Sequence, residues 1–74
     1  MNETDEIEVS INGAPLRLRA GATLPDALAT LGIGVESRGV AVALDGEVVP
    51  RSRWQVTHLV TGSRVEVVSA AQGG

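Results

Sequence analysis

The feature that most constrains the fold is an asparagine-glycine pair at positions 12 and 13. It lies between two stretches in which every second residue is apolar. The apolar members are Ile7, Val9 and Ile11 before the pair and Leu16, Leu18 and Ala20 after it. Alternation with period two is typical of a strand with one buried face. Asn-Gly favours the type I′ turn, which joins two neighbouring strands directly. We therefore expect a hairpin whose second strand carries Arg17 and Arg19 on its outer face.

A single amphipathic helix is predicted after the hairpin. Thr23 is a favourable N-cap, and Asp26 favours the positive end of the helix dipole and can complete a capping-box-like pair. Apolar residues then follow at helical spacing: Leu24, Ala27, Leu28 and Leu31. Gly32 or Gly34 is expected to end the helix, because glycine tolerates the left-handed conformation found at helix ends.

A second strand, turn and strand unit is predicted after the helix. The apolar members of its first strand again alternate: Val40, Val42 and Leu44. Asp45-Gly46 is another hairpin-type turn. The short strand that returns through residues 47–49 ends at Pro50, which lacks a backbone donor.

The last part of the chain predicts an irregular segment and a final strand. Residues 51–59 fit a short helical turn or a loop with three apolar anchors: Trp54, Val56 and Leu59. A turn around Gly62 follows. Residues 64–69 then form a strand in which Val65 and Val67 face the core and Val68 points away from it.

These elements predict an α+β fold. A helix packed across one face of a four- or five-stranded mixed sheet is the compact solution, with the first and last strands parallel at its centre. This is the β-grasp arrangement of ubiquitin-like proteins. We assign residues 6–69 to the β-grasp domain, residues 1–5 to a disordered polar leader and residues 70–74 to a flexible C-terminal tail.

Composition excludes several classes of function. The 74 residues include no cysteine and one histidine, His58, which is expected in a surface loop without a role. A disulfide and a cysteine nucleophile are therefore excluded, and a zinc site or a Ser-His-Asp arrangement is implausible. The net charge of -3 argues against nucleic acid as a partner. A polar, acidic start and the lack of a long apolar run argue against a signal peptide or membrane span, and favour the cytoplasm.

The Gly73-Gly74 ending is the feature that indicates chemistry. A glycine carboxylate on a narrow tail can enter an activating enzyme and be adenylated, because glycine lacks a Cβ and adopts dihedrals closed to other residues. All six basic residues are arginine. A guanidinium is a poor nucleophile toward an activated carboxylate, but we favour a composition rich in arginine as the explanation for the absence of lysine. We expect a carrier or cosubstrate, not a catalyst; a frayed terminus is the alternative.

Two segments resemble the ThiS family of thiamine-pathway sulfur carriers: VALDGEVVPRSRW at 42–54 and TGSRVEVVSAAQGG at 61–74. Both follow the family's layout: an apolar strand, an Asn/Asp-Gly turn, a short strand ending in Pro-Arg, a nearby Trp, and a final strand running into Gly-Gly. Asp45 stands where asparagine is commoner in the family, and either residue suits the turn.

The resemblance implies a reaction at Gly74. A partner adenylating enzyme of the E1-like kind would convert the Gly74 carboxylate to an adenylate with MgATP. Sulfur from a cysteine-desulfurase relay would displace AMP and leave a thiocarboxylate, from which thiazole synthase would take the sulfur. The chain itself is expected to bind no cofactor or metal, to be no enzyme, and to be a monomer when free. The expected partner-binding residues are Gly73, Gln72, Ala71, Val68, Arg51 and Arg53.

Other functions stay open. The small subunit of molybdopterin synthase shares the fold and the terminal chemistry, as do carriers for cysteine synthesis or tRNA thiolation; the Pro-Arg and Trp segment and the short length favour the thiamine branch. A ubiquitin-like protein modifier and an inert β-grasp interaction domain are rivals from other classes. Trp54 fits a partner interface, but we expect it to pack under its loop. Arg51 and Arg53 either meet an acidic partner or are solvated.

Overall fold

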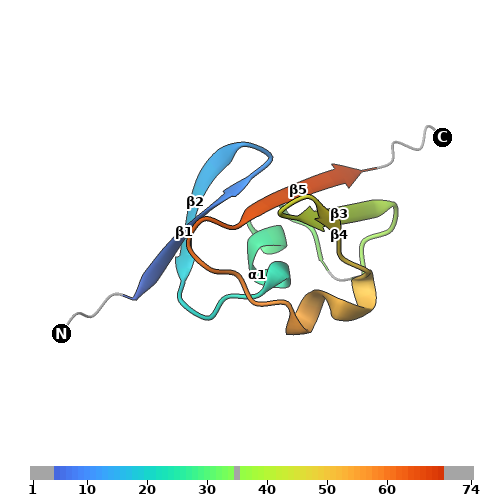
Figure 1. Cartoon of the computed structure of the whole chain (residues 1–74). Helices are drawn as coiled ribbons and strands as arrows, with labels where there is room; N and C mark the ends of the chain where they lie inside the picture. Colours follow the sequence, from blue (N-terminus) through green and yellow to red (C-terminus); the bar gives the residue numbers. More distant parts are fainter. Residues whose placement is uncertain (1–4, 35, 70–74) are drawn as a thin grey trace.

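A computed structural model describes residues 5–34 and 36–69 of the chain. Its elements, in chain order, are β1 (Glu6–Ile11), β2 (Ala14–Arg19), α1 (Leu24–Ala29), β3 (Val40–Leu44), β4 (Glu47–Val48), the 3-10 helix η1 (Arg51–Val56) and β5 (Arg64–Ser69) (Figure 1). The strands form one five-stranded mixed sheet, which confirms the predicted α+β class. Residues 1–4 of the predicted leader and the predicted tail 70–74 lie outside the described residues.

Both predicted hairpins are present. Asn12 and Gly13 have φ of 51° and 84°, the pair of positive values that a type I′ turn requires. Asp45 and Gly46 repeat the pattern between β3 and β4, with φ of 53° and 88°. The first hairpin pairs β1 with β2 over the full length of both strands, from Glu6 opposite Arg19 to Ile11 opposite Ala14 (a range of six pairs).

The strand order in the sheet is β2-β1-β5-β3-β4. The last strand, β5, therefore lies at the centre, parallel to β1 and antiparallel to β3. This confirms the expected parallel pairing of the first and last strands. The chain enters the sheet through β1 at one side of the centre, crosses by way of α1, and returns to fill the central position last (Figure 1).

Local hydrogen bonds begin and end α1. At its start, the Thr23 N–H donates to Oδ2 of Asp26 at 2.9 Å, as expected of a capping-box-like pair. At its end, Gly32 has φ of 77° and its N–H donates to the Ala29 carbonyl at 3.0 Å. With the Ile33 N–H donating to the Leu28 carbonyl at 3.1 Å, this is a Schellman motif. Gly32, rather than Gly34, ends the helix.

The expectation that Leu31 lies on the apolar face of the helix is wrong. The helix contains only six residues and ends at Ala29. Leu31 therefore belongs to the capping turn, where its side chain is 47% exposed. The buried face of α1 consists of Leu24, Ala27 and Leu28.

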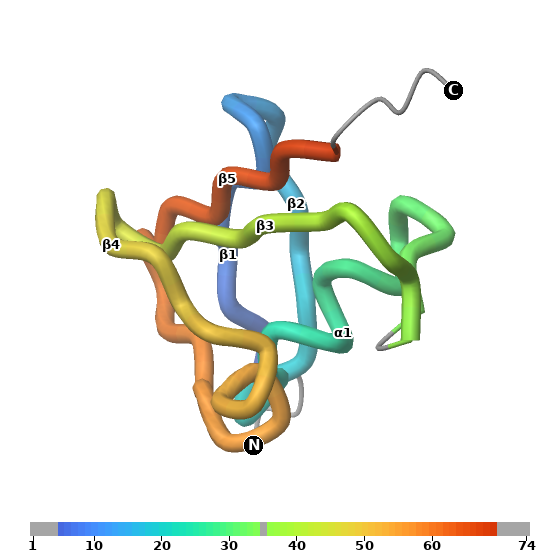
Figure 2. Tube along the Cα trace, turned by 90° about the vertical axis from the view of Figure 1, so that its right-hand side faces the viewer, coloured from blue at the N-terminus to red at the C-terminus, as the bar shows by residue number. Residues whose placement is uncertain are grey.

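The core lies between α1, η1 and one face of the sheet (Figure 2). Its buried members are Val9, Ile11, Leu24, Ala27, Leu28, Val42, Trp54, Leu59 and Val65. Trp54 is 1% exposed, and its indole N–H donates to the Val49 carbonyl at 2.9 Å. Trp54 thus packs under its loop, as expected. Val56 is not an anchor: it is exposed, because two residues along a 3-10 helix point in different directions.

Among residues 5–34 and 36–69, no helix lies on the opposite face of the sheet (Figure 2). Within the described residues, no helix is long and apolar enough to span a membrane.

Candidate functional site

The site begins where the described chain ends, at the C-terminal end of β5. Gly74, the predicted reactive residue, lies outside the described residues, as do Gly73, Gln72 and Ala71; their roles stay predictions. The last described residue, Ser69, pairs with Val40 of β3. The central strand of the sheet therefore positions the point from which the Gly-Gly segment continues.

Two turn residues fasten β5 on its two sides. Asn12 accepts a hydrogen bond from the Val67 N–H through Oδ1 at 2.8 Å, and its own N–H donates to the Val65 carbonyl at 2.9 Å. Because β1 stops at Ile11, the Asn12 side chain takes over the pairing that the strand no longer supplies. Asn12 therefore both forms a turn and holds the second half of β5.

Asp45 holds the start of β5 from the other side. Its Oδ1 accepts the Arg64 N–H at 2.9 Å, and its own N–H donates to the Arg64 carbonyl at 2.8 Å. We call the contacts of Asn12 and Asp45 with β5 the turn clamps. Sequence patterns assigned both residues to turns but missed this second role, since it depends on which strands are neighbours.

The open face of the sheet carries an apolar strip beside this end of β5. Strand register places Ala41 opposite Val68, Ala43 opposite Glu66, and Ala43 opposite Val48 on its other side. Directly paired residues project to the same face of a sheet. We call these five residues the open-face strip. Val68 is 64% exposed, so its predicted outward direction is confirmed.

Sequence reasoning identified only Val68 from this strip. The signal for Ala41 and Ala43 was present, since they alternate with the inward residues of β3. Val48 could be assigned to the open face only from the register of the second hairpin, which pairs it with Ala43.

The structure does not bring Arg51 and Arg53 to this strip. Both belong to η1, which packs against α1 on the covered side of the sheet. The Arg51 guanidinium lies 4.6 Å from the centre of the Trp54 ring and donates to the Ser37 carbonyl. Arg51 therefore joins η1 to the loop ahead of β3. Arg53 is exposed, and a role of either arginine in partner binding stays a prediction.

Over β1 and β2, the open face carries two pairs of opposite charge and the uncharged pair of Ser10 and Pro15. Register sets Glu6 opposite Arg19 and Glu8 opposite Arg17, and an ion pair joins Arg17 to Glu6 at 3.5 Å. Exposed ion pairs contribute little to stability, on the order of 0–1 kcal/mol. Their effect here is to balance charge across β1 and β2.

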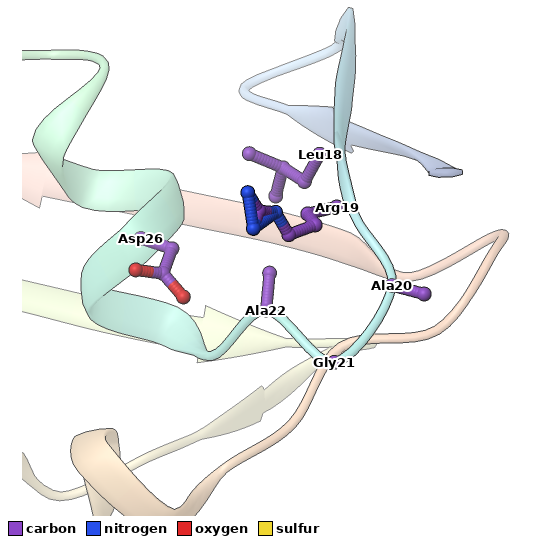
Figure 3. A pocket seen from close by; sticks show the side chains of 6 residues that line it. All are labelled: Leu18, Arg19, Ala20, Gly21, Ala22 and Asp26. Carbon is purple, nitrogen blue, oxygen red and sulfur yellow. The ribbon is translucent and has the colours of Figure 1, made fainter. Parts of the chain in front are cut away.

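A shallow hollow of about 390 Å³ lies between the end of β2 and the start of α1. Figure 3 shows the Arg19 guanidinium extending toward the side of the hollow on which Asp26 lies. Oxygen Oδ2 of Asp26 already accepts the Thr23 N–H, and small residues form much of the remaining lining. Within the described residues, no three His, Cys, Asp or Glu side chains gather as a metal site. His58 is exposed and forms an isolated bridge with Thr23.

A sheet with this strand order, crossed by one short helix on one face, defines a β-grasp protein of the ubiquitin-like class. The chain belongs to the ThiS family, whose family model matches residues 9–74.

Solved structures agree with this assignment. The chain is similar to the crystal structure of the thiamine biosynthesis protein ThiS from Geobacter metallireducens, with 26% identity and a TM-score of 0.74 over 92% of this chain and all of that one. An NMR solution structure of a thiamine biosynthesis protein from the same organism gives 26% identity and a TM-score of 0.71, over 92% of this chain and 88% of that one. A comparison with curated protein sequences gives no match.

Proposed function

We propose that this chain is a sulfur carrier of thiamine biosynthesis, whose Gly74 carboxylate is adenylated and then converted to a thiocarboxylate. The observation that carries the proposal is the ThiS-family match, which extends from β1 to Gly74. The structure supports it by placing β5, which leads into the Gly-Gly segment, at the centre of the sheet. The chain acts as a covalently modified cosubstrate, and its partners supply the catalysis.

The chemistry follows from the poor reactivity of a carboxylate. A carboxylate oxygen attacks the α-phosphorus of ATP, pyrophosphate leaves, and the acyl adenylate that results carries AMP as a good leaving group. A sulfur nucleophile then attacks the acyl carbon and AMP departs. MgATP binds to the partner adenylating enzyme. When a cysteine-desulfurase relay supplies the sulfur as a persulfide, the attack forms an acyl disulfide, and a thiol then cleaves its S–S bond, which releases the thiocarboxylate and leaves a disulfide.

The thiocarboxylate would then serve thiazole synthase, which builds the thiazole ring of thiamine. The carrier's own task is to present the acyl carbon to each partner. Glycine at the last two positions suits this task, because a backbone without Cβ atoms passes through a narrow channel. A cytoplasmic location and a monomeric free state stay predictions.

Intact-mass spectrometry tests the proposal. The full chain, incubated with its adenylating enzyme, MgATP and sulfide, is expected to gain the mass of one oxygen-to-sulfur exchange. Omission of ATP and removal of Gly73 and Gly74 should each abolish the gain. An unchanged full-length mass would contradict the carrier function for that enzyme, and conjugates on lysines of other proteins would favour a ubiquitin-like modifier.

The recipient is tested separately. Purified thiocarboxylate is offered to thiazole synthase with its other substrates, and to the large subunit of molybdopterin synthase with its precursor. Formation of the thiazole supports the thiamine assignment. Formation of a dithiolene alone would assign the chain to molybdopterin synthesis instead.

A further inference from the structure

The 3-10 helix η1 places one of its two arginines over the buried tryptophan. Arg51 and Trp54 lie three residues apart, and side chains at that spacing eclipse in a 3-10 helix. The Arg51 guanidinium accordingly lies 4.6 Å from the centre of the Trp54 ring. Trp54 is buried and hydrogen-bonded to the Val49 carbonyl, so its ring is a fixed surface. Arg53 is two residues farther along than Arg51 and points to a different side of η1.

The same guanidinium connects η1 to the turn ahead of β3. It donates to the Ser37 carbonyl while its face lies over the indole. Ser37 also closes a turn: its N–H donates to the Gly34 carbonyl at 3.0 Å, and its Oγ accepts the Gly34 N–H at 3.1 Å. A planar group that stacks on a ring and donates from its edge suits both contacts at once. Arg51 therefore fixes this turn to the rigid part of the core.

The turn matters because β3 alone holds the end of β5. Beyond Val67, which Asn12 holds, β3 is the sole sheet neighbour of β5 within residues 5–34 and 36–69. Val40, the first residue of β3, lies opposite Ser69, the last residue of β5. Ser37 lies three residues ahead of Val40. The end of β5 thus depends on a strand whose start is tied to η1 through Arg51.

Pairing at the end of β5 sets how much of the chain must be ordered when Gly74 enters an enzyme. Five residues lead from Ser69 to Gly74, and five extended residues span at most about 18 Å. If the end of β5 separates from β3, its residues join this segment. They must then be ordered again on binding, which lowers the apparent affinity for the enzyme.

We propose that Arg51 is a positioning residue for the reaction at Gly74: it holds the start of β3 through Ser37, and β3 in turn holds the end of β5. This inference rests on the proposed carrier function, since it concerns the same terminus. It gives the Pro-Arg and Trp segment a task at the reactive end of the chain, although η1 itself lies on the covered side of the sheet.

The amide of Val68 reports whether the end of β5 is paired with β3. The preceding amide, that of Val67, donates to Asn12 on the β1 side. Successive amides of a strand face opposite edges, so the Val68 amide faces β3. Amide hydrogen exchange of the free full-length chain, followed by NMR, measures its opening. The Arg64 amide, at the start of β5, is the internal reference.

Three variants separate position from charge. Arg51→Met and Arg51→Lys both remove the planar group that joins η1 to the turn, and lysine retains the charge. Arg53→Met removes the same charge from the same helix and leaves the connection intact. We expect the Val68 amide to exchange about two- to fivefold faster in both Arg51 variants, with little change at Arg64. In Arg53→Met, neither rate should change.

ATP–pyrophosphate exchange with the adenylating enzyme measures KM and kcat for the same full-length chains. We expect KM to rise about two- to threefold in both Arg51 variants with kcat unchanged, because apparent affinity falls with the fraction of chains in which the end of β5 is paired. Arg53→Met should behave as the unmodified chain. Circular dichroism establishes that each variant is folded. If Arg51→Met unfolds, Arg51→Lys carries the test; if neither folds, Arg51 serves global stability and the proposal is wrong.

The remaining outcomes are distinct. Unchanged exchange at Val68, or equal acceleration at Val68 and Arg64, would overturn the proposal, as would an unchanged KM in both Arg51 variants. A KM that rises in both methionine variants and is normal in Arg51→Lys would indicate a charge contact with the enzyme instead. If the unmodified chain supports no ATP–pyrophosphate exchange, the carrier function itself fails, and the amide rates still show whether Arg51 holds the end of β5.

Discussion

The turn clamps on β5 lead to a prediction that isolates one side chain. Asn12→Gly keeps a residue that adopts the positive φ of the turn and removes only the amide that accepts the Val67 N–H. The backbone hydrogen bond from Asn12 to the Val65 carbonyl is retained. The variant therefore tests whether the side chain itself holds the second half of β5.

The size of the effect follows from the geometry. The lost hydrogen bond is short, at 2.8 Å, and exposed. Loss of such a bond costs about 1 kcal/mol. The extra freedom of glycine in the unfolded chain adds a few tenths to about 1 kcal/mol, offset by relief of left-handed strain at Asn12. A 1 kcal/mol loss in the free energy of local opening corresponds to roughly fivefold faster exchange of the Val67 amide.

Amide hydrogen exchange followed by NMR measures the rate of local opening at each backbone amide. In Asn12→Gly, the Val67 amide should exchange roughly fivefold faster while the Arg64 amide, which Asp45 holds, changes less. Asp45→Gly is the matched variant and should show the reverse. Equal exchange at Val67 in the Asn12 variant and the unmodified chain would refute the clamp. Equal acceleration at both amides in both variants would show a global loss of stability instead.

Two further predictions concern the core. Trp54→Phe should lower the free energy of unfolding by about 2 kcal/mol, because a smaller ring leaves a void and the Val49 carbonyl loses its donor. Urea denaturation followed by circular dichroism measures this free energy. A loss no larger than that of an exposed substitution would contradict the packing role of Trp54. Leu28→Ala should cost about 2–5 kcal/mol by the same assay, whereas Leu31→Ala should cost less than about 0.5 kcal/mol. Equal losses at these two leucines would show that Leu31 packs on the helix face after all.

Much of the fold could be predicted because its signals are local. Alternating residues define β1, β2, β3 and β5, and the two Asx-Gly pairs define the hairpins. Leu31 and Val56 were wrongly expected to pack in the core, and both errors show what local spacing leaves undetermined. Apolar spacing shows which residues share a helix face but not where the helix stops, and a Schellman turn or a 3-10 helix redirects the next side chain.

The site was less predictable than the fold. The outward direction of Val68 follows from its own strand, and Asn12 and Asp45 are recognisable turn residues. The neighbours of these residues in the sheet cannot be predicted from a single segment. The pairings of Ala41 with Val68 and of Val67 with Asn12 join residues far apart in sequence. Long-range register therefore decides both the clamps and the strip. The Gly-Gly segment was predicted from chemistry and from resemblance to the ThiS family.

The transfer of isotopically labelled sulfur from this chain to a thiazole is the sharpest test of the proposed sulfur-carrier function. The chain is loaded at its terminus with heavy sulfur from labelled sulfide, purified away from its adenylating enzyme, and mixed with thiazole synthase for a single turnover. We predict that the heavy isotope appears in the thiazole product while the carrier returns to the mass of its carboxylate form. A thiazole product without the label, or a carrier that keeps its sulfur throughout the turnover, would show that this chain is not the sulfur donor.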